Sequence, residues 1–194
     1  MLNSLIPIIA SSGGAVAGAA YESIASAAGT GSSGTITFSS IPSTYVALQV
    51  RGIFRSTTAG VGLANLIVRF NSDTTNSNYS YHGLGGDGAS VLVGGGANSP
   101  IYLENCYPFA GNLANSVGVT IIDVHNYAST TQNKTLRAFS SYQNNNADAG
   151  ITPVLELNSG LWRNTGAINS ITISGGSDNF TTTTSFALYG IKGA

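Results

Sequence analysis

Short runs of alternating apolar and polar residues, separated by clusters of glycine, asparagine and serine, dominate this sequence of 194 residues. Leu66, Val68 and Phe70 lie on one side of such a run, and Ile171 and Ile173 on one side of another. A period of two is typical of half-buried β-strands, whereas an amphipathic helix needs apolar residues at a period of 3.6. No segment sustains the helical period. The sequence therefore predicts an all-β fold, a two-sheet antiparallel sandwich of jelly-roll type.

The remaining strands are expected where the alternation recurs. Val46, Leu48 and Val50 share one face, and Gly52 then shifts the pattern so that Ile53 continues it, which predicts a β-bulge. The segment 186–191 is nearly continuous in apolar residues and is expected in the middle of a sheet. Further apolar faces are formed by Ile36 and Phe38, by Val117, Val119 and Ile121, and by Leu136 and Ala138.

The first 34 residues differ in composition from the rest, because a short apolar start is followed by alanine, serine and repeated glycine. Small residues with many glycines cannot build a core, so residues 1–34 are expected to form an extended N-terminal arm and a flexible connector. Residues 35–194 are expected to form the sandwich domain. A short helix over residues 15–28 is the alternative, which Gly18 disfavours.

The apolar residues of the arm are candidate contacts with a partner. Leu2, Leu5, Ile6, Ile8 and Ile9 would each contribute about 1.5–3 kcal/mol when buried on another surface, before ordering costs. Pro7 favours an extended path here. The run lacks the basic start of a secretory signal and is too short to span a bilayer, so no membrane partner is expected.

Charged residues are scarce. Asp, Glu, Lys and Arg make up only 8% of the chain, against about 25% in a typical protein, and the formal net charge is −1. The seven cations are scattered singly, so the chain offers no basic surface for nucleic acid, and no nucleic-acid partner is expected. Depletion of charge is a property of interface cores, which favours assembly or surface display.

The titratable residues form no recognisable catalytic or metal-binding motif. Asp123 and His125 share a strand face, but no nucleophile motif accompanies them, and two histidines cannot alone supply a three-ligand zinc site. Glu22, Glu104 and Glu156 are isolated along the chain. The expectation is therefore a protein that is not an enzyme, with no catalytic, cofactor-binding or metal-ligating residues and no cofactor.

Three other features have ordinary structural interpretations. Residues 83–88 match the G-x-G-x-x-G pattern of dinucleotide sites, but the next residues resemble a strand rather than a helix, which predicts a hairpin. Asp73, Asn76 and Asn78 are interpreted as turn formers rather than Ca²⁺ ligands. Cys106, the single cysteine, is interpreted as a small buried hydrophobic residue.

The aromatic residues leave two interpretations open. Tyr79, Tyr81, His82 and Trp162 could present a surface on which sugars stack, or they could fill the core and interfaces. The burial of these side chains distinguishes the two.

Several stretches together resemble a family of small virion structural proteins of tailed phages. The matching pieces are GSSGTITFSSIPSTY at residues 31–45, LQVRGI at 48–53, RFNSD at 69–73, NYSYH at 78–82, LNSGLW at 157–162 and SFALYGI at 185–191. The resemblance implies a jelly-roll capsid decoration (cement) protein on the outer surface of the head, a homotrimer whose partners are the major capsid protein and copies of itself. It carries over no active-site residues.

Two other functions compete with capsid decoration. A tail-fibre or baseplate component would bind host-surface glycan and would place the protein on the tail. A glycan hydrolase would need a pair of carboxylates.

Overall fold

The computed structural model describes residues 20–145 and 150–193, in which strands account for nearly all regular structure. A single turn of 3-10 helix, η1 (Asn76–Asn78), precedes β5. The strands are β1 (Tyr21–Ala28), β2 (Thr35–Phe38), β3 (Ala47–Phe54), β4 (Leu63–Phe70), β5 (Tyr79–Gly86), β6 (Val91–Ala97), β7 (Ile101–Pro108), β8 (Gly118–His125), β9 (Lys134–Tyr142), β10 (Val154–Trp162), β11 (Ile171–Ser174) and β12 (Ser185–Ile191).

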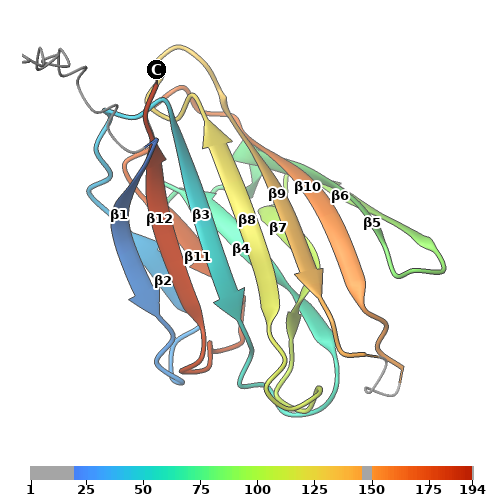
Figure 1. Cartoon of the computed structure of the whole chain (residues 1–194). Coiled ribbons are helices and arrows are strands. Elements are labelled where there is room, and N and C mark those ends of the chain that lie inside the picture. The colour runs from blue at the N-terminus through green and yellow to red at the C-terminus, as the bar shows by residue number, and fades with distance from the viewer. Residues whose placement is uncertain (1–19, 146–149, 194) are drawn as a thin grey trace, which may run out of the picture.

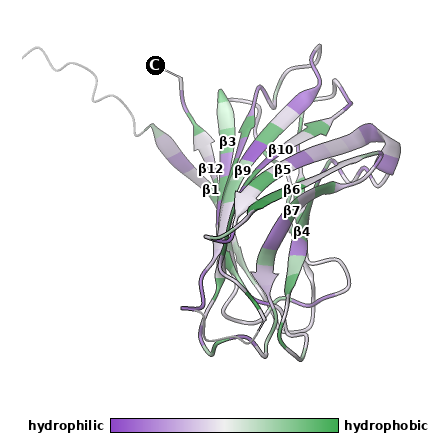
Figure 2. Ribbon diagram, turned by 90° about the vertical axis from the view of Figure 1, so that its right-hand side faces the viewer, coloured by the Kyte–Doolittle hydropathy of each residue, from purple (hydrophilic) through white to green (hydrophobic). Residues whose placement is uncertain are grey.

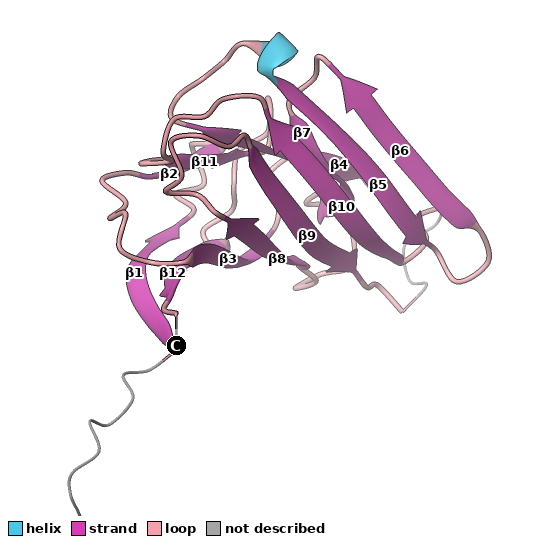
Figure 3. Ribbon diagram, turned by 90° about the horizontal axis from the view of Figure 1, so that it is seen from above, coloured by secondary structure: helices cyan, strands magenta, loops and turns pink. Residues whose placement is uncertain are grey.

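The strands form two packed antiparallel sheets (Figure 1). The larger sheet has eight strands in the order β1-β12-β3-β8-β9-β10-β5-β6, and the smaller has four in the order β2-β11-β4-β7. Seen from above, the smaller sheet lies against one side of the larger, and the β5–β6 hairpin lies at the opposite end from β1 (Figure 3). The expected all-β sandwich is confirmed, and the jelly-roll type stays a prediction.

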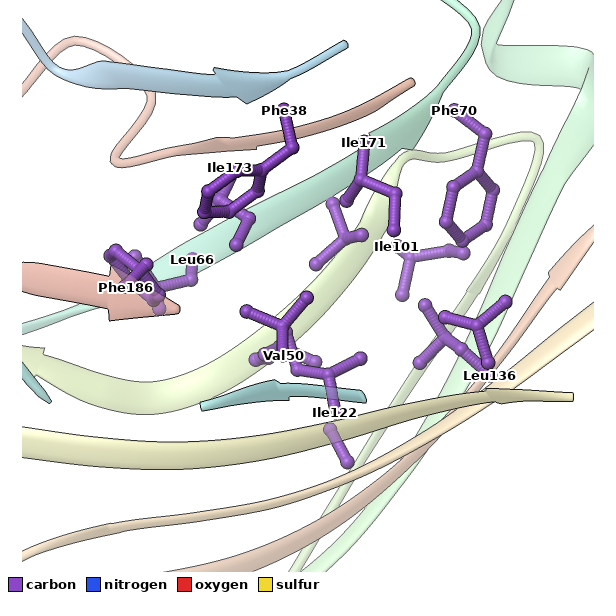
Figure 4. Packing of buried hydrophobic residues seen from close by; sticks show 14 of the residues in the cluster. Phe38, Val50, Leu66, Phe70, Ile101, Ile122, Leu136, Ile171, Ile173 and Phe186 are labelled. Atoms are coloured by element: carbon purple, nitrogen blue, oxygen red, sulfur yellow. The ribbon is translucent and has the colours of Figure 1, made fainter. Parts of the chain in front are cut away.

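The core lies between the two sheets and follows the predicted alternation in most strands. Leu66, Val68 and Phe70 of β4 are fully buried, and Ile171 and Ile173 of β11 lie beside them. They face the inner side of the larger sheet, as the close view in Figure 4 shows. The facing residues labelled there are Val50, Ile122, Leu136 and Phe186. Seen from the side, hydrophobic and hydrophilic residues alternate along the strands (Figure 2).

The bulge predicted at Gly52 is wrong. β3 pairs with β8 and with β12 in unbroken register through this residue, so Ile53 points outward and is exposed. Gly52 is required for a steric reason instead, because a Cβ there would lie 2.2 Å from Cδ1 of the Phe186 ring. Val46 lies just before the strand and is exposed, while Leu48 and Val50 are buried as expected.

The apolar face predicted around Val119 and Ile121 exists, but it points away from the core. In β8 the residues that fill the core are Ile122 and Val124. The strand is therefore apolar on both sides, and its outward side remains exposed to solvent.

Residues 21–28 form a strand rather than the flexible connector or the helix considered from composition. β1 pairs along its length with β12, from Tyr21 opposite Ile191 to Ala28 opposite Ser185, so this part of the expected connector belongs to the larger sheet. The candidate arm contacts, Leu2, Leu5, Ile6, Ile8 and Ile9, lie outside the described residues.

Arg55 holds the long loop between β7 and β8 to the body. The residue is buried, and its guanidinium donates hydrogen bonds of 2.5–3.0 Å to the loop. The accepting carbonyl oxygens belong to Ala110, Asn112, Leu113 and Ser116. Buried charge is thereby satisfied by backbone dipoles.

Candidate functional site

A row of exposed apolar side chains crosses five strands on the outer face of the larger sheet. Leu157 of β10 lies opposite Phe139 of β9 on one side and Leu84 of β5 on the other. The row continues to Ile121 of β8 and Val93 of β6. These five side chains, named the apolar row below, are between 42% and 81% exposed. Contiguous apolar surface of this kind marks a binding site more often than isolated exposed residues do.

A second, interrupted row runs parallel to the first. It contains Val119, Leu155 and Val91, with Ile53 beside Val119 in the register. Its members are also exposed. The outer face is therefore apolar over two neighbouring rows rather than along a single line.

A polar row borders the apolar row on its other side. His82, Ser159, Arg137, Asp123 and Gln49 are neighbours in the strand register. Nε2 of Gln49 donates to Oδ1 of Asp123 at 2.7 Å, and Nε of Arg137 donates to Oδ2 at 3.3 Å. The Arg137 side chain is mostly exposed, so this ion pair contributes little to stability.

The apolar and polar rows line one depression in the sheet surface, with a volume of about 610 Å³. Its wall includes Leu84, Ile121, Phe139 and Leu157 together with His82, Ser159, Arg137 and Asp123. The depression can hold an apolar segment in its middle and a polar group at its border.

Burial decides between the two interpretations left open for the aromatic residues. Tyr79, Tyr81 and Trp162 are buried, whereas His82 is exposed in the polar row. The Trp162 ring packs against Tyr79 with ring centroids 6.3 Å apart and against Phe70 at 5.7 Å. The core-filling interpretation is correct for these three residues, and Phe139 is the aromatic side chain that lines the depression.

Asp73 organises the turn before β5, as its turn-former interpretation requires. Its Oδ2 accepts hydrogen bonds from Nε1 of Trp162 and Nδ2 of Asn78, both at 2.8 Å, and its Oδ1 accepts one from the Thr75 amide at 2.9 Å. Burial alone would raise the pKa of Asp73, but these hydrogen bonds outweigh it and lower the pKa to about 2. The carboxylate therefore fastens the turn to the core through Trp162.

The other two motifs behave as predicted. Residues 83–88 lie in β5 and the turn that leads to β6, so the glycine pattern forms a hairpin and not a dinucleotide site. Cys106 is buried, and burial raises the pKa of its thiol to about 12. Asp123 and His125 both project from the outer face, where Asp123 is already bound by Gln49 and Arg137.

One pairing of acidic residues was not predicted from the sequence. Burial is the largest cause that raises the pKa of Glu156 on β10. The nearby charge of Glu104 on β7 raises this pKa further. A signal was present, since glycines alternate at residues 83, 85, 94 and 96 and leave room on one side of the hairpin. Within residues 20–145 and 150–193, no group of three or more His, Cys, Asp or Glu residues could hold a metal ion.

Comparisons with known proteins give no match: no known family, no curated protein and no solved structure is similar to this chain. The described residues also contain no helix with the length and hydropathy needed to cross a membrane. Function is therefore inferred from the outer face and from the sequence motifs.

Proposed function

We propose that the protein is a structural component of a tailed-phage virion, a capsid decoration (cement) protein that attaches through the outer face of its larger sheet. The observation that carries this proposal is the apolar row across five strands, from Val93 to Ile121. The resemblance of several stretches, such as residues 31–45 and 185–191, to small phage virion proteins is the reason to place the protein on a phage particle. The scarcity of charge fits an interface, since few charges would lose water on binding.

The energetics favour attachment by this face. Each large apolar side chain of the row gains about 1.5–3 kcal/mol on full burial, which offsets the ordering cost of association when several act together. Apolar pairs across neighbouring strands stabilise the sheet itself by only about 0.2–1 kcal/mol each, which is less than burial of the same side chains against a partner would give. A binding partner therefore explains why the row is apolar.

The shape of the face favours a protruding partner. Two depressions placed against each other would leave a void, and voids lose dispersion contacts. We therefore assign the face to the major capsid protein. Copies of this protein meet elsewhere, as the homotrimer that the resemblance implies, and the apolar arm residues provide a second contact with the particle. Sedimentation of the free protein tests the trimer, and a monomer both free and on the particle would contradict it.

Copy number on purified phage particles tests the attachment proposal. The variant is Phe139→Ser with Leu157→Ser, and Val61→Ser is a matched control because Val61 is 49% exposed and lies outside both rows. Quantitative mass spectrometry should find hundreds of copies per particle for the natural protein and the control. It should find far fewer for the double variant. Full occupancy by the double variant would overturn the role of the outer face.

The alternative function is a tail-fibre or baseplate component that binds host-surface glycan. The polar row favours it, since His82, Ser159 and Arg137 could contact sugar hydroxyls beside the Phe139 ring. A handful of copies per particle, together with glycan binding that Phe139→Ser removes, would support this function over capsid decoration.

A further inference from the structure

A group of polar side chains, two of them buried and one half-buried, lies beneath the β5–β6 hairpin, on the side of the sheet opposite the apolar row. Glu156 and Asn158 point inward from β10, and Glu104 approaches from β7 in the smaller sheet. Glu156 is 2% exposed and Asn158 is 3% exposed. The buried side chains of this group point away from the proposed attachment face, although Gly83 and Asn158 also border the depression on that face.

Glycines of the hairpin make the room that these side chains occupy. A Cβ on Gly94 would lie 1.6 Å from Oε2 of Glu104. A Cβ on Gly85 would lie 2.6 Å from the carbonyl oxygen of Leu155 and 2.8 Å from Cδ of Glu156. Any side chain at either position would displace a carboxylate. Glycine at these positions of β5 and β6 therefore leaves the room that the two carboxylates occupy.

Three polar atoms converge on one point above Gly83. The position of a Cβ on Gly83 lies 2.8 Å from Oε2 of Glu104, 3.5 Å from Oε2 of Glu156 and 2.8 Å from Nδ2 of Asn158. Asn158 lies directly opposite Gly83 in the strand register. Two negative charges and one amide thus share a small space.

Each carboxylate has one oxygen bound and turns the other toward this space. Oε1 of Glu104 accepts a hydrogen bond from the Tyr81 hydroxyl at 3.1 Å, and Oε1 of Glu156 accepts one from Nδ2 of Asn105 at 3.2 Å. Glu104 and Asn105 lie in a bulge of β7, because the pairing of β4 with β7 shifts from Ala64 opposite Tyr107 to Leu66 opposite Leu103. Bulges commonly redirect side chains next to binding sites.

Asn158 supplies an independent indication of a ligand. Both its Oδ1 and its Nδ2 are buried with no hydrogen-bond partner. Leaving a buried amide unsatisfied costs about 1–3 kcal/mol. The side chain is aimed at the space between the carboxylates, and rotation of its amide would present Oδ1 there.

We propose that Glu104, Glu156 and Asn158 bind a divalent cation, Ca²⁺, beneath the hairpin. Two carboxylate oxygens and an amide oxygen are hard ligands of the type Ca²⁺ prefers, and its flexible coordination allows water to complete the shell. The cation would neutralise the two facing carboxylates and satisfy the amide. This site differs from the sequence-based expectation of no metal ligands, which considered carboxylates only by their spacing along the chain.

Thermal unfolding of the full chain at pH 7 tests the site, after dialysis against EDTA and then with CaCl₂ added. When the Ca²⁺ concentration is one hundred times the Kd of the site, Tm should be about 5–10 °C higher in CaCl₂ than in NaCl of equal ionic strength. Glu156→Gln should melt no lower than the natural protein in EDTA, because it removes the repulsion, and it should lose the response to Ca²⁺. Glu22→Gln is the control and should keep the full response, since Glu22 is an exposed partner of Lys192.

A second measurement uses Tb³⁺ bound in place of Ca²⁺. In the natural protein, Tyr81 should sensitise the luminescence of bound Tb³⁺, and added Ca²⁺ should displace the ion and remove the signal. Glu104→Gln should show no sensitised luminescence. Equal Tm shifts in CaCl₂ and NaCl would overturn the proposal. So would a response to Ca²⁺ that Glu156→Gln retains. Stabilisation by acid alone, with no effect of Ca²⁺, would mean that a shared proton occupies the space instead.

Discussion

Replacing Asp73 by Asn should weaken the fold at neutral pH and have no effect in acid. The carboxylate accepts hydrogen bonds from Trp162, Asn78 and Thr75, and an amide cannot accept all of them. The Trp162 indole, buried in the core, would then lose its charged acceptor. Hydrogen bonds to charged groups are stronger than those between neutral groups. The variant should therefore be less stable than the natural protein only at pH values where Asp73 is ionised.

The pKa of Asp73 sets both the magnitude and the pH range. Its pKa falls from 3.8 to about 2 in the folded state, so the ionised carboxylate stabilises the fold above about pH 4. That stabilisation is lost as the pH falls through about 2. One pKa unit corresponds to about 1.4 kcal/mol, and screening by solvent reduces the contribution to about 1–2 kcal/mol.

Urea unfolding followed by the fluorescence of Trp162, the single tryptophan, measures this effect. The free energy of unfolding of Asp73→Asn should lie about 1–2 kcal/mol below that of the natural protein at pH 7, and the two values should converge between pH 4 and pH 2. Asp87→Asn, in the exposed β5–β6 turn, is the control and should lose much less, because the Ala89 and Ser90 amides donate to a single oxygen of Asp87, and the amide oxygen of Asn can accept both. A difference that stays constant or grows in acid would refute the reasoning.

Three further predictions concern packing and the arm. Gly118→Ala should lower the free energy of unfolding by about 1–3 kcal/mol, because the new Cβ would lie 2.0 Å from the carbonyl oxygen of Cys106. Gly86→Ala is the control and should be tolerated, because its Cβ would meet its nearest atom at 3.5 Å. Urea unfolding compares the two variants, and equal losses of stability would contradict the steric argument. Arg55→Met should lower the free energy of unfolding by about 3 kcal/mol and increase amide hydrogen exchange in the loop between β7 and β8. Unchanged exchange would show that contacts other than those of Arg55 hold this loop. Deleting residues 1–19 should leave the Tm of the body nearly unchanged but weaken attachment to particles, and full occupancy by the truncated protein would exclude an attachment role for the arm.

Strand alternation predicted most of the core but could not decide which face of β8 is buried. Ile122 and Val124 alternate with Val119 and Ile121, so a period-two pattern exists on both sides of the strand. The smaller sheet packs on the side of β8 that carries Ile122 and Val124, and this packing makes that side the core. Residues that bind a partner look like core residues in a sequence, because both are selected for apolar surface.

The group of polar side chains beneath the β5–β6 hairpin could not be predicted for a different reason. Glu104 and Glu156 belong to different sheets, and only the packing of β7 on β10 brings them together. Gly52 shows the same limitation, since its local pattern suggested a bulge while the cause is the Phe186 ring on a strand far along the chain. Local patterns determine strands, but contacts between distant strands determine sites.

The β5–β6 hairpin also makes the molecule a candidate scaffold for peptide display. Its turn lies at the far end of the larger sheet from β1 (Figure 3), and a Cβ on Gly88 would meet no atom within 4 Å. A peptide inserted between Gly88 and Ala89 would leave the turn away from the core, and lengthening a surface loop costs little free energy. In the free protein, the hairpin would present the insert to the surrounding medium.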